Sequence, residues 1–375
     1  MNTTTSDTAL RTLCEQARTH TEHGERHHTL APQVWQALRA SPLPLAAVPA
    51  DYGGHQWEVP RILEAVHQVA SADPAAGWAA AIHAPAGAFL ARVGPQVARQ
   101  VCPALPGTVV IAGGSAPMGQ ALPAGPGKVT LSGTWPLVTG ADHMDLAAMA
   151  ARVHTDTPTV RWFLIDAAQA TVHHDWDALG LRGSASCSVT VDTTVETAHS
   201  LDLTEPAVVE DALYRFPLYG LLAACIAQVS HATAHRALAL FRDIADHTHT
   251  RHARGALADQ AHPQQIYAHA HAALDAAHTL VQAAVSHAWG QARTATVDGQ
   301  VRARVRAACC HMAATARQVC QELFDAAGSS AVHRSTGLER CWRDSLVASR
   351  HALVASRGRQ LAGAALLGRP AAPEL

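Results

Sequence analysis

Two histidines in helix-forming segments are candidates for proton transfer. His83 ends the stretch DPAAGWAAAIH, and His351 follows LERCWRDSLVASR near the carboxyl end. An imidazole titrates near neutral pH, so such a ring can take up or release a proton in a reaction at neutral pH. The chain has 25 histidines, however, so an ordinary surface position is the alternative for both.

Other histidines and cysteines have spacings that resemble metal sites. His231 and His235 are four residues apart in a helical run, with His269 and His271 on the next one. No third ligand and no HExxH glutamate accompanies them. In the run 309–311 two adjacent cysteines precede a histidine, but neighbouring helical residues point about 100° apart and cannot easily share one tetrahedral ion. The sequence therefore predicts no metal site.

The composition excludes several classes of protein. The formal net charge of −2 and the pI near 6.9 give no basic field for nucleic acid or an anionic membrane. The apolar runs are far shorter than the roughly 20 residues of a membrane span, and MNTTTSDTALRTLCEQ lacks the features of a signal peptide. The eight cysteines show no CxxC spacing, so we expect reduced thiols in a cytoplasmic protein.

The elements that must position the histidines fall into three zones, which we place at 1–104, 105–204 and 205–375. Proline opens three of the four helices expected in the first zone, and Asp73 is expected to cap one of them. These helices are Thr8–His28, Pro32–Ala40, Pro60–Ala72 and Pro74–Val93. The second zone has short β-branched runs between Gly, Pro and Asp turns, which predict a compact, barrel-like antiparallel β domain.

The third zone is again helical. Its four expected helices are 207–250, 263–297, 299–326 and 338–366. Long helices with short connections predict an antiparallel four-helix bundle. The fold class is therefore mainly α with a central β domain, and 48% hydrophobic residues suffice for a large core.

Local motifs in this order resemble the acyl-CoA dehydrogenase fold. VPADYGG is similar to the family's VPxxxGG turn, and WDALGLRGSAS resembles its WxxxGLRGTxS strand and turn. RHARGALADQAHPQQ looks like the RxxxGxxLxDxPxxQ entry into a bundle helix, and LERCWRD resembles the family's LxRxxRD run. The resemblance covers nearly the whole chain. It implies an N-terminal helical domain, an antiparallel β domain and a C-terminal four-helix bundle.

Three features differ from the dehydrogenases and resemble the two-component flavin-dependent monooxygenase branch of the fold (group D hydroxylases). His351 stands where the dehydrogenases carry a catalytic glutamate, and His83 ends a helix similar to the GW…H helix of the hydroxylases. IAGGSAPMGQALP replaces the dehydrogenase pattern TEPxAGSD. GTWPLVTGADH resembles the family's GxWxxxSG, with Thr139 in place of the usual serine near the flavin.

The resemblance implies a set of site residues. His83 and His351 are the implied catalytic residues, and Trp78 contacts substrate. The implied flavin-binding residues are Gly114, Ser115, Trp135, Thr139, Arg254, Gly328 and Ser329. Core packing is the alternative for Trp135, and a solvated charge is the alternative for Arg254. A structural ion-pair lattice is the alternative for Arg340, Arg343 and Asp344.

The implied function is an oxygenase component that uses reduced flavin (FMN or FAD) and O2. It would hydroxylate an aromatic or polyketide-like substrate, of the kind found in secondary metabolism, or oxidise an amine nitrogen. A separate NAD(P)H-dependent flavin reductase and a homotetramer, in which a neighbouring subunit completes the flavin site, are implied with it. One alternative is a dehydrogenase or desaturase on an acyl or carrier-bound substrate, with Glu322 and Glu339 as the nearest acids. A flavin-free scaffold protein of the same fold is the other.

Overall fold

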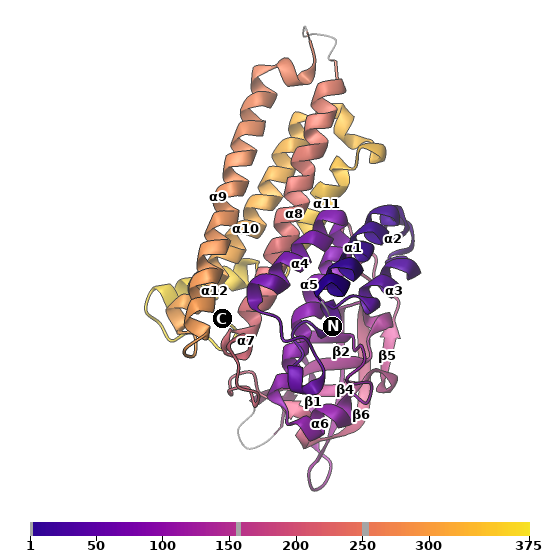
Figure 1. The fold of residues 1–375 in the computed structure, drawn as a ribbon, viewed down its shortest axis with the longest axis vertical. Coiled ribbons are helices and arrows are strands. Elements are labelled where there is room, and N and C mark those ends of the chain that lie inside the picture. Colours follow the sequence, from indigo (N-terminus) through magenta and orange to yellow (C-terminus); the bar gives the residue numbers. More distant parts are fainter. Residues whose placement is uncertain (1–2, 155–158, 250–254) are drawn as a thin grey trace. The chain divides into compact units, whose positions relative to one another are not determined.

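The computed structural model describes residues 3–154, 159–249 and 255–375 (Figure 1). The chain divides into two compact units, which we describe separately. The first unit comprises Met1–Asp177, Arg182–Leu218 and Ala292–Thr296. The second comprises Ala178–Leu181, Tyr219–Gln291 and Val297–Leu375.

The first unit begins with helices. They are α1 (Thr3–Thr19), α2 (Thr21–His27), α3 (Pro32–Ala40), α4 (Val59–Ala72), α5 (Pro74–Ala86) and α6 (Pro95–Val101), and the short α7 (Ala212–Arg215) follows the sheet. Asp73 caps α5 as predicted, because its Oδ1 accepts from the backbone N–H of Ala76 at 2.9 Å.

Two of the expected helices end earlier than predicted. The segment Thr8–His28 is divided into α1 and α2, where the Thr19 and Thr21 hydroxyls donate to carbonyls one turn back. Such bonds compete with the helical ladder. The segment Pro74–Val93 is α-helical only to Ala86 and continues as a 3-10 helix, Gly87–Arg92. Pro85, which lacks a backbone N–H, lies just before this change.

One seven-stranded sheet completes the first unit. Its strands are β1 (Ile111–Pro123), β2 (Lys128–Thr139), β3 (Leu146–Val153), β4 (Thr159–Asp166), β5 (Ala170–His173), β6 (Ser186–Glu196) and β7 (Ser200–Leu201). The spatial order is β5-β6-β2-β1-β3-β4-β7. The prediction of an all-antiparallel domain needs one correction, because β1 and β3 pair in parallel. On its other side β1 forms an antiparallel hairpin with β2, and β2 pairs in turn with β6.

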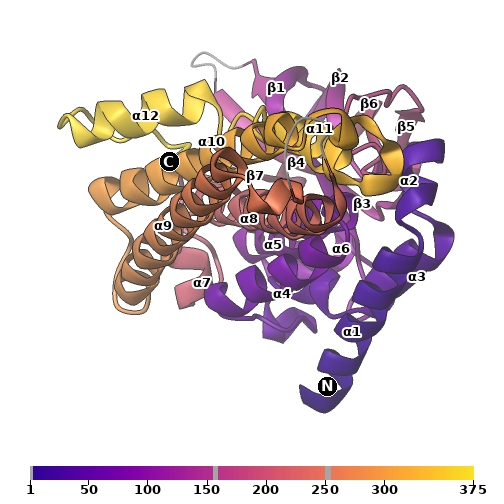
Figure 2. The same ribbon diagram turned by 90° about the horizontal axis from the view of Figure 1, so that it is seen from above.

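The second unit contains the long helices α8 (Leu218–His247), α9 (Ala261–Ala292) and α10 (Gly299–Ala326) and the short helices α11 (Leu338–Ala348) and α12 (Ser356–Leu366). The long helices run side by side in both ribbon views (Figures 1 and 2). Asp298 caps α10 through its Oδ1, which accepts from the N–H groups of Gln300 and Val301 at 2.8 and 2.9 Å.

The fourth expected bundle helix, 338–366, is wrong as a continuous helix. Residues 349–355 form turns between α11 and α12. Gly358 in the first turn of α12 lies so close to α10 that a Cβ atom there would be 2.9 Å from Cys310 Sγ. The chain therefore bends to pack α12 against α10, where Ala303, Ala362 and Ala365 are buried together.

None of the described helices is both long and apolar enough to cross a membrane. The eight cysteines, all within the described residues, are buried free thiols.

Candidate active site

Helix α5 holds the His83 ring in the interior of the first unit, where only 1% of the residue is exposed. Its Nδ1 is 2.9 Å from the carbonyl oxygen of Ile111 on β1. A carbonyl only accepts, so Nδ1 carries the ring proton and Nε2 is left as an acceptor. That Nε2 is buried and has no hydrogen-bond partner among the described residues. Burial lowers the pKa of His83 to about 4, so the ring is neutral at pH 7.

The turn after β2 closes over this ring. Gly140 has a φ of +64° there, and a Cβ atom would be 2.6 Å from both His83 Nε2 and the Trp35 ring. Only glycine satisfies both conditions. Trp35, on α3, lies 5.9 Å from His83 between ring centroids and stacks on His143 at 4.2 Å. Its buried Nε1 donor also has no partner within the described part of the chain.

Nothing in the sequence singles out Trp35. A tryptophan on an amphipathic helix is indistinguishable from a core residue without coordinates. His143 is the last residue of the motif GTWPLVTGADH, which by itself assigns no role to this histidine.

A chain of buried hydroxyl groups lies next to Gly140. The Trp78 Nε1–H donates to Thr139 Oγ1 at 3.1 Å, and Thr139 Oγ1 is 3.0 Å from Ser186 Oγ. Ser186 Oγ in turn is 2.9 Å from Ser184 Oγ. Strand pairing aligns Thr139 with Ser186, so the network is fixed by the β2–β6 register. Two of the three hydrogen-bonding capacities of the Thr139 hydroxyl are therefore used within the protein.

Trp135 is a core residue of the sheet. It is completely buried, and its Nε1–H donates to the Ala150 carbonyl at 2.7 Å. Complete burial and this hydrogen bond are the features expected from the packing alternative for Trp135. Gly114 lies against the Trp135 side chain, where a Cβ atom would be 2.7 Å away. Ser115 follows in a bulge of β1 and is exposed.

His351 lies in the second unit, in the turn between α11 and α12. Its Nδ1 accepts from the Leu353 N–H at 3.3 Å, so the ring proton is on Nε2. Burial, followed by the charge of Arg306, lowers the pKa of His351 to about 4. The two histidines are thus both neutral but carry the proton on different nitrogens.

The remaining expected flavin residues are less constrained by the structure. Gly328 and Ser329 are exposed at the end of α10, and Gly328 has a φ of +58°. Arg254 lies outside the described residues.

The LERCWRD motif forms the structural lattice that was its alternative. Asp344 Oδ1 accepts from the Leu181 N–H at 2.6 Å, and its Oδ2 is 3.5 Å from Arg340 Nε. Arg343 donates to the Leu179 carbonyl at 2.7 Å and forms an ion pair with Glu339 at 2.6 Å. The motif thereby holds Leu179 and Leu181 against α11.

Glu322, the other acid considered as a base, is also engaged. Its Oε1 accepts from Gln318 at 2.8 Å, and its Oε2 is 4.0 Å from His269 Nε2. Neither acid of the dehydrogenase alternative is therefore poised as a general base.

Comparison with known proteins identifies the fold. The family model described as "Acyl-CoA dehydrogenase, C-terminal domain" matches residues 224–356. The structure of XiaF from Streptomyces sp., solved with FADH2 and glycerol, superposes with a TM-score of 0.88 over 97% of this chain and 95% of XiaF, at 22% identity. The chain has an acyl-CoA dehydrogenase-like fold.

The relatives that this chain matches in sequence are oxygenases. Indole-3-acetate monooxygenase of Acinetobacter baumannii is 24% identical over 373 residues, covering 97% of this chain and 95% of the relative. The oxygenase component of an FADH2-dependent resorcinol hydroxylase from Rhizobium sp. is 26% identical over 331 residues, covering 81% of this chain and 79% of the relative. The family resemblance predicted from the motifs is confirmed, including its branch.

The buried His83 predicts a pH-dependent stability. Because the pKa of His83 is about 4 when folded and 6.5 when unfolded, only the unfolded chain binds this proton between those values. The free energy of unfolding is expected to fall by up to roughly 3 kcal/mol from this group as pH drops from about 6.5 to about 4. Urea unfolding of the protein and of His83→Gln at several pH values measures the difference. Equal pH slopes in both proteins would contradict it.

Proposed function

We propose that this protein is the oxygenase component of a two-component flavin-dependent monooxygenase that acts on an aromatic ring. A separate NAD(P)H-dependent reductase would supply the reduced flavin. The observation that carries the proposal is His83, a neutral, buried imidazole whose acceptor nitrogen is unpaired within the described residues. The relatives that extend along this chain supply the reaction class.

The surroundings of His83 fit a polar reactant. Two buried polar atoms beside Gly140, the Nε2 acceptor of His83 and the Nε1 donor of Trp35, lack partners among the described residues. Unpaired buried polar atoms are costly unless a ligand satisfies them. We propose that the Thr139–Gly140 turn and the β1 bulge at Gly114–Ser115 contribute to the flavin site. A bound reduced flavin would supply the electrons that activate O2.

The residues of this chain then have distinct tasks. His83 accepts a proton or a hydrogen bond at Nε2, as the removal of a hydroxyl or ring N–H proton requires. His351 donates from Nε2–H, as an oxygen atom that gains charge requires. Trp78 and Ser186 position the Thr139 hydroxyl, and the apolar core around them excludes water.

The test supplies chemically reduced FMN or FAD, isotopically labelled O2 and an aromatic substrate. Indole-3-acetate is the first probe, because the relative that spans 97% of this chain acts on it. Resorcinol and other phenols follow. We expect a product that contains one labelled oxygen atom and depends on the protein. Oxygen uptake at the rate of free reduced flavin, with no labelled product from any probe, would refute the proposal.

The same proposal predicts no acyl-CoA dehydrogenase activity. His351 has a lowered pKa and is neutral at pH 7. Glu339 forms an ion pair with Arg343, and Glu322 accepts a hydrogen bond from Gln318. No strong base is therefore in place to remove a proton beside a thioester. Saturated acyl-CoAs are expected not to reduce protein-bound oxidised flavin under anaerobic conditions. Bleaching of the flavin absorbance by one of them would favour the dehydrogenase alternative.

We further propose a homotetramer, located in the cytoplasm, with a dimer as the alternative assembly. In the second unit Leu280, Val332 and Leu367 are 47%, 61% and 83% exposed, and Gly328 and Ser329 lie next to Val332 in sequence. A second copy would cover such apolar side chains. Multi-angle light scattering at micromolar concentration measures the mass. A monodisperse monomer would rule the assembly out.

A further inference from the structure

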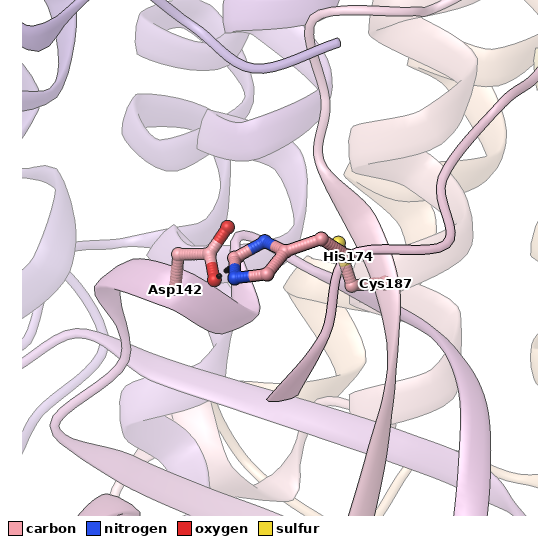
Figure 3. Close-up of side chains that lie close together, drawn as sticks. All are labelled: Asp142, His174 and Cys187. Atoms are coloured by element: carbon pink, nitrogen blue, oxygen red, sulfur yellow. Dashed lines mark ion pairs between the residues drawn. The ribbon is translucent and has the colours of Figure 1, made fainter. Parts of the chain in front are cut away.

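Three metal-ligand side chains meet at one end of the sheet of the first unit, and none of them is used in the proposed function. They are Asp142, His174 and Cys187 (Figure 3). One potential ligand atom of each lies within 4.8 Å of the others. Asp142 Oδ1 and His174 Nδ1 are 3.4 Å apart, with 25% and 77% of their side chains exposed. Cys187 is buried, so its sulfur forms the floor of the cluster.

The sheet order explains why these residues meet. β6, which carries Cys187, lies between β5 and β2. Asp142 is in the 3-10 turn Ala141–His143 that follows β2, and the register pairs Val138 of β2 with Cys187. The turn is fastened to the start of β6, because the Gly140 N–H donates to backbone carbonyls there at 3.1 and 3.2 Å.

The other side of β6 holds His174 in the same way. His173, the last residue of β5, pairs with Ser188. Asp175 Oδ1 accepts from the Ser188 N–H at 2.8 Å, so both neighbours of His174 are tied to the residue after Cys187. The three ligand side chains are therefore presented by three chain segments that strand pairing and hydrogen bonds hold in place, as a specific site requires.

We propose that Asp142, His174 and Cys187 form a binding site for a divalent transition metal ion, with Zn²⁺ as the best match. A tetrahedral site with Zn–N and Zn–O bonds of about 2.0–2.1 Å and a Zn–S bond of about 2.3 Å needs ligand atoms roughly 3.3–3.6 Å apart. The Asp142–His174 separation of 3.4 Å already meets this requirement. The sulfur is within 4.8 Å, and the exposed His174 side chain can move to close the gap.

The chemistry of the ligands favours the same ions. Thiolate and imidazole together select zinc and its neighbours over magnesium and calcium, which prefer oxygen ligands. Binding would release the thiol proton of Cys187 to solvent. Three protein ligands leave the fourth position for water or a ligand. The three ligand residues line a cleft of about 430 Å³, which His27, His28 and His143 also line.

The test uses Co²⁺, which takes zinc sites and gives a thiolate-to-metal charge-transfer absorption. We expect one tight Co²⁺ per chain with this absorption, displaced by Zn²⁺. Cys187→Ser should abolish the charge-transfer band. His174→Ala should weaken the affinity by at least tenfold to a hundredfold, since changes outside the first ligand sphere already cost that much. His174 is exposed, so its replacement leaves the core intact.

Matched controls separate this site from the other histidines and thiols. His154→Ala changes an exposed histidine on another strand end, and Cys102→Ser changes a cysteine that is as buried as Cys187, at 3%. Both should bind Co²⁺ as the unchanged protein does. Absence of the thiolate band, or its persistence in Cys187→Ser, would overturn the proposal, and so would unchanged affinity in His174→Ala. No flavin or substrate is present, so the outcome is independent of the proposed oxygenase function.

Discussion

Replacing either His83 or His351 by alanine is expected to reduce product formation by about 10²–10⁴-fold, the usual effect of losing a general acid or base. Oxygen uptake should continue, with the oxygen released as hydrogen peroxide. The reason is that each ring contributes one specific nitrogen, an acceptor in His83 and a donor in His351. Product yield and peroxide yield per oxygen consumed measure the coupling. Binding of reduced flavin should be nearly unchanged.

Controls distinguish lost chemistry from disturbed packing. Cys341→Ala on α11 and Cys102→Ala in the first unit remove buried side chains without a proposed role. Both should keep the coupling of oxygen to product. The double histidine variant should be little worse than the worse single variant if both groups act in one step. Normal coupling in His351→Ala would refute the shared role, whatever His83→Ala shows.

Asp344→Ala is expected to have the largest effect on stability. Asp344 is 1% exposed, accepts from the Leu181 N–H and lies 3.5 Å from Arg340. Removing one partner of a buried ion pair costs about 3–5 kcal/mol. At roughly 2–4 °C per kcal/mol, the midpoint of thermal unfolding should fall by about 6–20 °C. Differential scanning fluorimetry checks this expectation.

A matched carboxylate shows whether burial is the cause. Asp325 on α10 is exposed, and within the described part of the chain its carboxylate accepts hydrogen bonds from Gln321. Asp325→Ala should therefore change the midpoint of thermal unfolding by at most about a degree or two. Gly180→Ala should resemble Asp344→Ala, because its Cβ atom would be 2.3 Å from the Arg343 carbonyl oxygen. A flavin-binding role for Asp344 with no structural role would instead leave the midpoint unchanged.

Local sequence signals predicted those parts of the fold in which a backbone group requires a particular type of side chain. The cap at Asp73 and the zones of helix and strand follow from such signals. The break at residues 349–355 could not be predicted, because the Ala, Leu and Arg residues there are good helix formers. Packing of Gly358 on Cys310, a contact between distant segments, accompanies the bend. The parallel pairing of β1 with β3 likewise depends on contacts between residues far apart in the sequence.

The candidate site was predictable only as far as its motifs extend. The sequence identified His83 and Thr139 through such motifs, but the ring nitrogen that stays unpaired depends on the Ile111 carbonyl. Trp135 stands in a flavin-type motif and yet fills the core, since its indole N–H is used by Ala150. The sequence does not predict the cluster formed by Asp142, His174 and Cys187, because strand order, rather than spacing, brings these residues together.

The division of the chain has a consequence for how it is synthesised. The backbone changes unit after Asp177, Leu181, Leu218, Gln291 and Thr296. The first unit therefore includes the segment Ala292–Thr296, whose Ala292 carbonyl accepts from Arg215 at 2.7 Å. Translation adds about 5–20 residues per second. The first unit thus cannot be completed on the ribosome until several seconds after its sheet has emerged, and no single cut in the gene would yield either unit whole.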